Sequence, residues 1–246
     1  MWKRSSNIAR NDRSQQPAVG HFVAPWPHTV FILGVLVLWA VYGAFRVQLP
    51  VHAFPHGVTY TSSIVIQSLL VGSTVAGLYH RRKFIDAVVG PISTPSIMRD
   101  LRAGIAIFFG ALVCLVLFRA ALRALGIALT SRHDAVLALA PRNIYELLLW
   151  FAVSLFAGVC EEFVFRGYLQ QQMTHWFRNA LPAIGICSLL FGTLHFYQGT
   201  AGALQTALLG LIYGLVAHER GNLRSVMLAH FLQDAFAGTI LFLRHA

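Results

Sequence analysis

Long apolar runs recur along this chain and leave only short polar segments between them. Such runs cover residues 29–47, 58–79, 101–122, 143–173, 181–197, 201–218 and 223–243. About 20 apolar residues are enough for a helix to cross a bilayer, and a spanning backbone must satisfy its own hydrogen bonds, which helices do. The pattern therefore predicts an all-α fold, a polytopic transmembrane helical bundle with about seven spans.

The composition agrees with a membrane protein and disagrees with a soluble one. Hydrophobic residues make up 57% of the 246 residues and charged residues only 11%, with a mean hydropathy of +0.63. A typical soluble domain is about 25% charged. Residues 29–246 are therefore predicted to form one transmembrane domain, whereas residues 1–28 are polar and basic and predict a disordered cytosolic tail.

The formal net charge of +10 reflects membrane topology rather than nucleic-acid binding, because no basic stretch is interleaved with aromatic residues. With the amino terminus inside, the cytosolic segments hold four, five, one and two basic residues, twelve of the nineteen. This bias follows the positive-inside rule. We predict an integral protein of the cell (inner) membrane with a cytosolic amino terminus. The topology of residues 119–142 stays open, because four arginines fall there on the outer side.

Two carboxylates and a guanidinium interrupt the apolar run at Val159 to Leu169. Each acid at the centre of a membrane helix costs about 2.5–3.5 kcal/mol on insertion scales. Glu162 and Arg166 are four residues apart and share a helix face, which predicts an ion pair. Glu161 points elsewhere and has no partner nearby in the sequence. We therefore expect Glu161 to face a wet cavity or a catalytic centre.

Three further polar groups lie in later apolar segments. A lone histidine such as His195 is more often a hydrogen-bonded packing residue than a ligand. His230 and Asp234 are four residues apart and share a helix face, and a carboxylate beside an imidazole fixes the tautomer and orientation of the ring. The alternative is a structural polar clasp between helices. Together with Glu161, these groups favour one shared polar site.

In their order and spacing, these residues resemble the CPBP family of intramembrane proteases, also called the Abi family, which includes CAAX proteases and bacteriocin-processing enzymes. The family pattern is E-E-x-x-x-R, then F-x-x-x-H, then H-x-x-x-N/D. The corresponding motifs are Glu161-Glu162-x-x-x-Arg166, Phe191-x-x-x-His195 and His230-x-x-x-Asp234. The resemblance covers a motif-bearing core at about residues 143–243, and the first three spans carry no motif.

The resemblance implies a role for each motif. In the CAAX prenyl endopeptidases of this family, the first glutamate and the histidine of the second motif activate water, which would assign Glu161 and His195 to that task. The Glu–Arg pair of the first motif would be structural. The third motif helps to hold the oxyanion, which would place His230 and Asp234 on the electrophilic side.

Asp234 departs from the asparagine that is usual in the prenyl endopeptidases. Asparagine donates a hydrogen bond at every pH, whereas an aspartate donates only when it is protonated. An ionised Asp234 would instead orient His230. Both roles stay open.

A divalent metal such as Zn²⁺ is a second open point. Glu161, His195 and His230 are a ligand set that Zn²⁺ accepts, with water in the fourth position. The sequence has no H-E-x-x-H motif, so the mechanism typical of that motif does not transfer. If Glu161 were a ligand, another group would have to act as the base.

The predicted function is an intramembrane endopeptidase of the CAAX-protease-like kind. It would hydrolyse a peptide bond of a membrane-associated protein, prenylated (CAAX-like) or transmembrane, reached from the membrane or its cytosolic face. Its partners would be membrane lipid and this peptide or protein substrate, with no nucleic acid. Two alternatives stay open: a non-catalytic immunity or assembly partner, since fold and motif do not prove activity, and a proton-coupled transporter, which also buries ionisable groups.

Overall fold

The computed structural model describes residues 23–46, 55–81, 85–90 and 94–244, and within these ranges it is helical, without strands. In chain order the elements are α1 (Trp26–Arg46), α2 (His56–His80), α3 (Asp86–Val89), α4 (Thr94–Ala124), α5 (His133–Leu137), α6 (Ile144–Glu162), the π-helix η2 (Phe163–Leu169), α7 (Gln170–Phe177), α8 (Ala180–Thr193), the 3₁₀ turn η3 (Phe196–Gln198), α9 (Gly199–Arg220) and α10 (Arg224–Leu243). The predicted all-α bundle is confirmed.

Six helical segments in the described part of the chain are long and apolar enough to cross a membrane. They are α1, α2, α4, the continuous α6–η2–α7 segment, α9 and α10. The seventh predicted span, residues 181–197, coincides largely with α8, which has only 14 residues. At 1.5 Å per residue α8 is about 21 Å long, short of the roughly 30 Å hydrocarbon core. The chain is an integral membrane protein, and its described part contains six helical segments long enough to span a bilayer and one shorter apolar helix.

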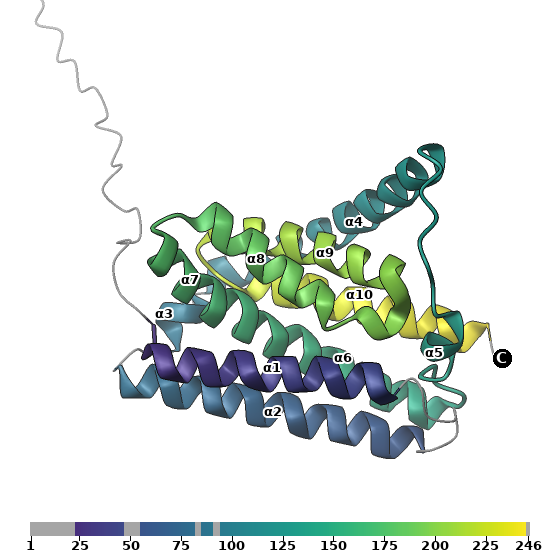
Figure 1. Ribbon diagram of the computed structural model, residues 1–246, viewed down its shortest axis with the longest axis horizontal. Helices are drawn as coiled ribbons and strands as arrows, with labels where there is room; N and C mark the ends of the chain where they lie inside the picture. The colour runs from purple at the N-terminus through teal and green to yellow at the C-terminus, as the bar shows by residue number, and fades with distance from the viewer. Residues whose placement is uncertain (1–22, 47–54, 82–84, 91–93, 245–246) are drawn as a thin grey trace, which may run out of the picture.

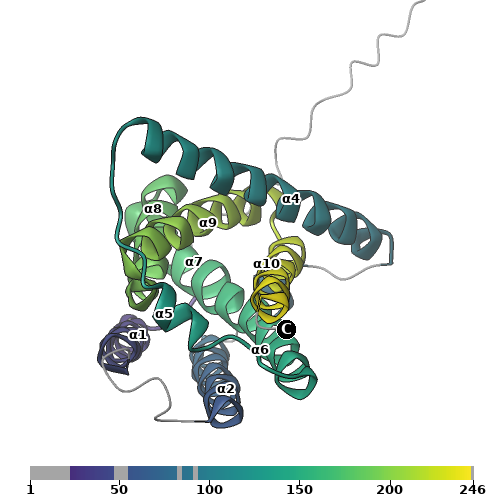
Figure 2. The same cartoon turned by 90° about the vertical axis from the view of Figure 1, so that its right-hand side faces the viewer.

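The α6–η2–α7 segment runs through the middle of the bundle. Figure 1 shows α1 and α2 side by side on one side of it and α8, α9 and α10 on the other. The end-on view of Figure 2 shows α4 lying across α9 and α10. All seven residues of η2 are buried. The first motif therefore lies in the most enclosed part of the fold, where a π-helical turn often marks a functional site.

A glycine brings α6 and α10 together beside the first and third motifs. A Cβ atom at Gly158 would lie 2.8 Å from the carbonyl oxygen of Met227 and 2.9 Å from the backbone nitrogen of Phe231. Small residues permit such backbone approaches between membrane helices. Gly158 precedes Glu161 by three residues and Phe231 follows His230, so this contact sets the spacing of the two motifs.

The predicted amino-terminal tail lies mostly outside the described residues. Within the described part, α1 begins at Trp26 rather than at the predicted residue 29, because Pro27 falls in the first turn, where a missing N–H costs nothing. The Gln172 side chain of α7 holds the preceding segment: its Oε1 accepts from the backbone nitrogens of Val23 and Ala24 at 3.0 and 3.2 Å. The start of α1 is thereby tied to the motif-bearing segment.

Candidate active site

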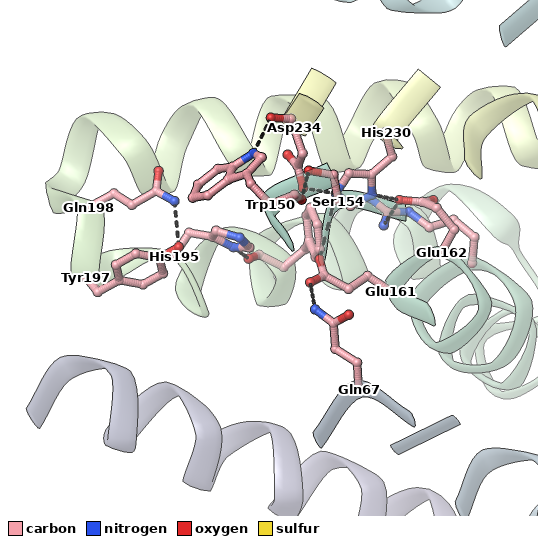
Figure 3. Close-up of polar contacts among 12 residues, drawn as sticks. Gln67, Trp150, Ser154, Glu161, Glu162, His195, Tyr197, Gln198, His230 and Asp234 are labelled. Atoms are coloured by element: carbon pink, nitrogen blue, oxygen red, sulfur yellow. Dashed lines mark hydrogen bonds and ion pairs between the residues drawn. The ribbon is translucent and has the colours of Figure 1, made fainter. Parts of the chain in front are cut away.

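A cavity of about 1260 Å³ lies within the bundle, and its wall includes side chains from all three motifs. Glu161, His195, His230 and Asp234 all line it. Figure 3 shows these side chains converging from α6, from the turn after α8 and from α10. The prediction that the ionisable groups surround one cavity is confirmed for these residues.

Glu161 is the member of the acidic pair that faces the cavity, as expected. Its side chain is 24% exposed, and its Oε2 lies 3.9 Å from Nε2 of His230. Its other oxygen, Oε1, accepts a hydrogen bond of 3.2 Å from Nε2 of Gln67 on α2. Gln67 carries no motif and lies 94 positions away in the sequence. Sequence reasoning missed this residue, and no local pattern signals it.

Glu162 is fully buried and bonds to two motif residues at once. Its Oε1 accepts from Nη1 of Arg166 at 2.9 Å, which confirms the predicted ion pair. The same oxygen accepts from Nδ1 of His230 at 2.8 Å. Glu162 therefore does more than neutralise Arg166, because it also ties the first motif to the third.

Arg166 is enclosed by groups that suit a buried cation. Its Nη2 donates to the carbonyl oxygen of Gly210 on α9 at 3.1 Å. Its guanidinium carbon lies 4.6 Å from the ring centroid of Phe191, a cation–π distance. The Phe191 ring also meets the ring of His230 edge-on at 5.9 Å. The phenylalanine of the second motif thus packs between two residues of the other motifs.

The Glu162 bond orients His230. With Nδ1–H donating to this carboxylate, Nε2 is directed toward Glu161 and Asp234. Asp234 Oδ2 is 3.5 Å from Nε2, beyond a direct N–H···O hydrogen bond. The contact that holds the ring therefore comes from Glu162, and the role of Asp234 stays a prediction.

The apolar pattern suggested that His195 lies inside a helix. In the structure it lies just beyond the end of α8. The helix ends at Thr193, and His195 adopts φ −103° and ψ 12° at the start of η3. Its Nδ1 donates to the carbonyl oxygen of Phe191 at 2.9 Å, which satisfies one of the carbonyls left unpaired at a helix end. The other ring nitrogen, Nε2, is therefore left unprotonated in the neutral ring, on the cavity wall.

The donor types needed for zinc are present at the site, but they are not assembled. Among the described residues, no group of three or more His, Cys, Asp or Glu side chains is arranged to hold a metal ion. Nδ1 of His195 donates a hydrogen bond to a backbone carbonyl, and one carboxylate oxygen of Glu161 accepts a hydrogen bond from Gln67. The zinc set of Glu161, His195 and His230 remains a prediction, and no step proposed below passes through a metal.

Comparison with protein families gives one finding. Residues 143–236 match the model described as type II CAAX prenyl endopeptidase Rce1-like. The match begins at Asn143, whose side chain caps the amino terminus of α6, and ends two residues beyond Asp234, so it includes all three motifs. The chain has no significant match among curated proteins or solved structures. The family predicted from the motifs is confirmed for this part of the chain.

Proposed function

Residues 143–236 match the model of the type II CAAX prenyl endopeptidase Rce1-like family, and from this premise we propose that the protein is an intramembrane endopeptidase. It hydrolyses a peptide bond of a membrane-associated or lipid-modified protein with water activated by Glu161 and His195. The observation that carries the proposal is the shared cavity wall: both residues line one cavity in a membrane-spanning bundle, with His230 and Asp234 beside them.

Amide hydrolysis needs a base for water, a donor for the developing oxyanion and a proton for the leaving amine. Glu161 takes a proton from water through Oε2, the oxygen that Gln67 leaves free. His195 can take up this proton from Glu161 on its unprotonated Nε2 and then pass it to the leaving nitrogen. These two side chains supply the first and last requirements.

His230 supplies the donor for the oxyanion. Its Nδ1 is held by the buried Glu162 carboxylate, which leaves Nε2 beside Glu161 at the cavity. When both ring nitrogens carry a proton, Nε2–H can donate to the oxyanion. Glu162 and Arg166 do not touch the substrate and act by positioning His230.

The cavity wall suits a substrate with an apolar part. Val35, Leu36 and Trp39 of α1 and Leu112, Leu115 and Val116 of α4 line it together with the polar groups. An apolar wall next to a polar centre fits a prenylated peptide or a transmembrane segment. We propose the cell (inner) membrane as the location, with the amino terminus cytosolic, on the charge bias of the sequence.

The test is substrate trapping with Glu161→Gln, which keeps the size of the side chain and removes its basicity. Cells that express the wild type are compared with cells that express this variant, and new peptide termini are mapped by mass spectrometry of membrane proteins. We expect termini that depend on wild type and a full-length precursor that accumulates with Glu161→Gln. Glu219→Gln, an exposed acid near the end of α9, is the matched control.

Two outcomes would contradict the proposal. Equal processing by wild type and Glu161→Gln would mean that this carboxylate is not the base. Proton flux into liposomes, carried by the purified protein and lost in Glu161→Gln, would favour a transporter instead.

A further inference from the structure

Gln67 brings to the site a polar side chain that lies outside the family match at residues 143–236. It comes from α2, which packs directly against α6. Its Nε2 donates to Oε1 of Glu161 at 3.2 Å, and both residues line the same cavity. Figure 3 shows the amide rising from α2 toward this carboxylate.

The other end of the Gln67 amide has no protein partner. Its Oε1 is buried, and no described residue donates a hydrogen bond to it. A buried carbonyl oxygen at membrane depth calls for a donor, and here the side chain forms part of the wall of a cavity. The Gln67 amide is therefore held at one end only, by the carboxylate of Glu161.

An interhelical packing role does not account for this pattern. The polar neighbours of Gln67 on the cavity face of α2 donate to nearby backbone carbonyls, within α2 or just before it. Ser62 and Ser63 donate to the carbonyl of Thr59, and Thr59 donates to the carbonyl of Pro55. Gln172, a true packing glutamine, uses both ends of its amide on backbone groups. Gln67 instead bonds to the carboxylate proposed as the base.

We propose that Gln67 is a positioning residue that orients Glu161. Its N–H holds Oε1 of Glu161, so that Oε2 faces the attacking water. One O–H bond of the water breaks as Oε2 takes the proton, and the water oxygen forms a bond to the substrate carbonyl carbon. The C–N bond then breaks, and the proton leaves with the amine nitrogen.

This inference rests on the proposed function, so its test has one readout with substrate and one without. With substrate, Gln67→Leu is expected to lower kcat about ten- to a hundred-fold, the scale of a misplaced reacting group, with KM changed less than about three-fold. Ser63→Ala is the control, because it removes a hydroxyl one turn away on the same face that bonds only within α2. An unchanged kcat, or an effect on KM alone, would overturn the proposal.

The substrate-free readout is the infrared carboxylate band of Glu161, isolated as the difference between wild type and Glu161→Gln in lipid. We expect Gln67→Leu to shift this band, because the carboxylate loses a donor, and Ser63→Ala to leave it in place. An unshifted band in Gln67→Leu would overturn the proposal even if activity fell. If wild type hydrolyses nothing, the proposed function fails, whereas the band still decides whether Gln67 holds Glu161.

If Gln67→Leu does not accumulate in the membrane, Gln67→Asn takes its place. It keeps an amide but is one methylene shorter, so it can occupy the cavity wall without reaching Glu161. The same fall in kcat and the same band shift are expected. Wild-type values for both readouts would contradict the role assigned to Gln67.

Discussion

Replacing Glu162 by alanine removes the one oxygen that accepts from both Arg166 and His230. The two lost hydrogen bonds alone would cost about 1 kcal/mol, since interhelical bonds in membrane proteins average about 0.6 kcal/mol. The larger effect is the stranded guanidinium, which loses its carboxylate partner and keeps the Gly210 carbonyl and the surrounding aromatic rings. Breaking a buried ion pair on one side costs about 3–5 kcal/mol. We therefore expect Glu162→Ala to lower the free energy of unfolding by about that amount.

The assay is reversible unfolding in mixed micelles, followed by tryptophan fluorescence, for Glu162→Ala, Arg166→Leu and the double variant Glu162→Leu/Arg166→Leu. The double variant strands no charge and is expected to recover most of the lost stability, because apolar replacement of a whole buried pair is often neutral. It should still hydrolyse slowly, since His230 has lost its acceptor. Glu219→Ala, an exposed acid, is the control and is expected to unfold like wild type.

Three results would refute the reasoning. Wild-type stability of Glu162→Ala would mean that the pair is not desolvated. Equal loss in the single and double variants would mean that a stranded charge is not the cause. Full activity of the double variant would mean that Glu162 does not orient His230, and the ion pair would then be purely structural.

Two further predictions concern α10 and its contact with α6. Asp234→Asn should keep the packing, because the two side chains are nearly isosteric. If Asp234 is ionised beside His230, the substitution should shift the pH dependence of turnover. If Asp234 is protonated and donates a hydrogen bond, the activity of the variant should extend to higher pH, because asparagine donates at every pH. A pH–rate profile decides between them, and an unchanged profile and rate would remove Asp234 from the site. Gly158→Leu should destabilise the protein by about 1–3 kcal/mol and slow hydrolysis, because the leucine side chain would meet backbone atoms of Met227 and Phe231. Unfolding in micelles measures the first effect and the rate of hydrolysis the second. Wild-type stability and rate would show that α6 and α10 need not approach so closely.

The sequence by itself determined the fold class and predicted the candidate reactive groups. Apolar runs long enough to span a bilayer are a local signal, because each helix must satisfy its own backbone. Charges inside such runs are costly and therefore informative. The Glu162–Arg166 pair could also be predicted, because two residues four apart on a helix meet whatever the rest of the chain does.

Only the tertiary structure decided which groups share partners. Glu162 and His230 are 68 positions apart, and Glu161 and Gln67 are 94 apart, so their contacts depend on how α2, α6 and α10 pack. The end of α8 before His195 was equally hidden, because apolar character continues through Phe196 and Tyr197 after the helix has ended. Hydropathy is a property of each residue alone and indicates whether that residue can lie in the membrane. A hydrogen bond between two helices depends instead on how the helices are placed relative to each other. For that reason the sequence identifies the candidate reactive residues, and only the packed bundle shows that Glu162 holds His230 and Gln67 holds Glu161.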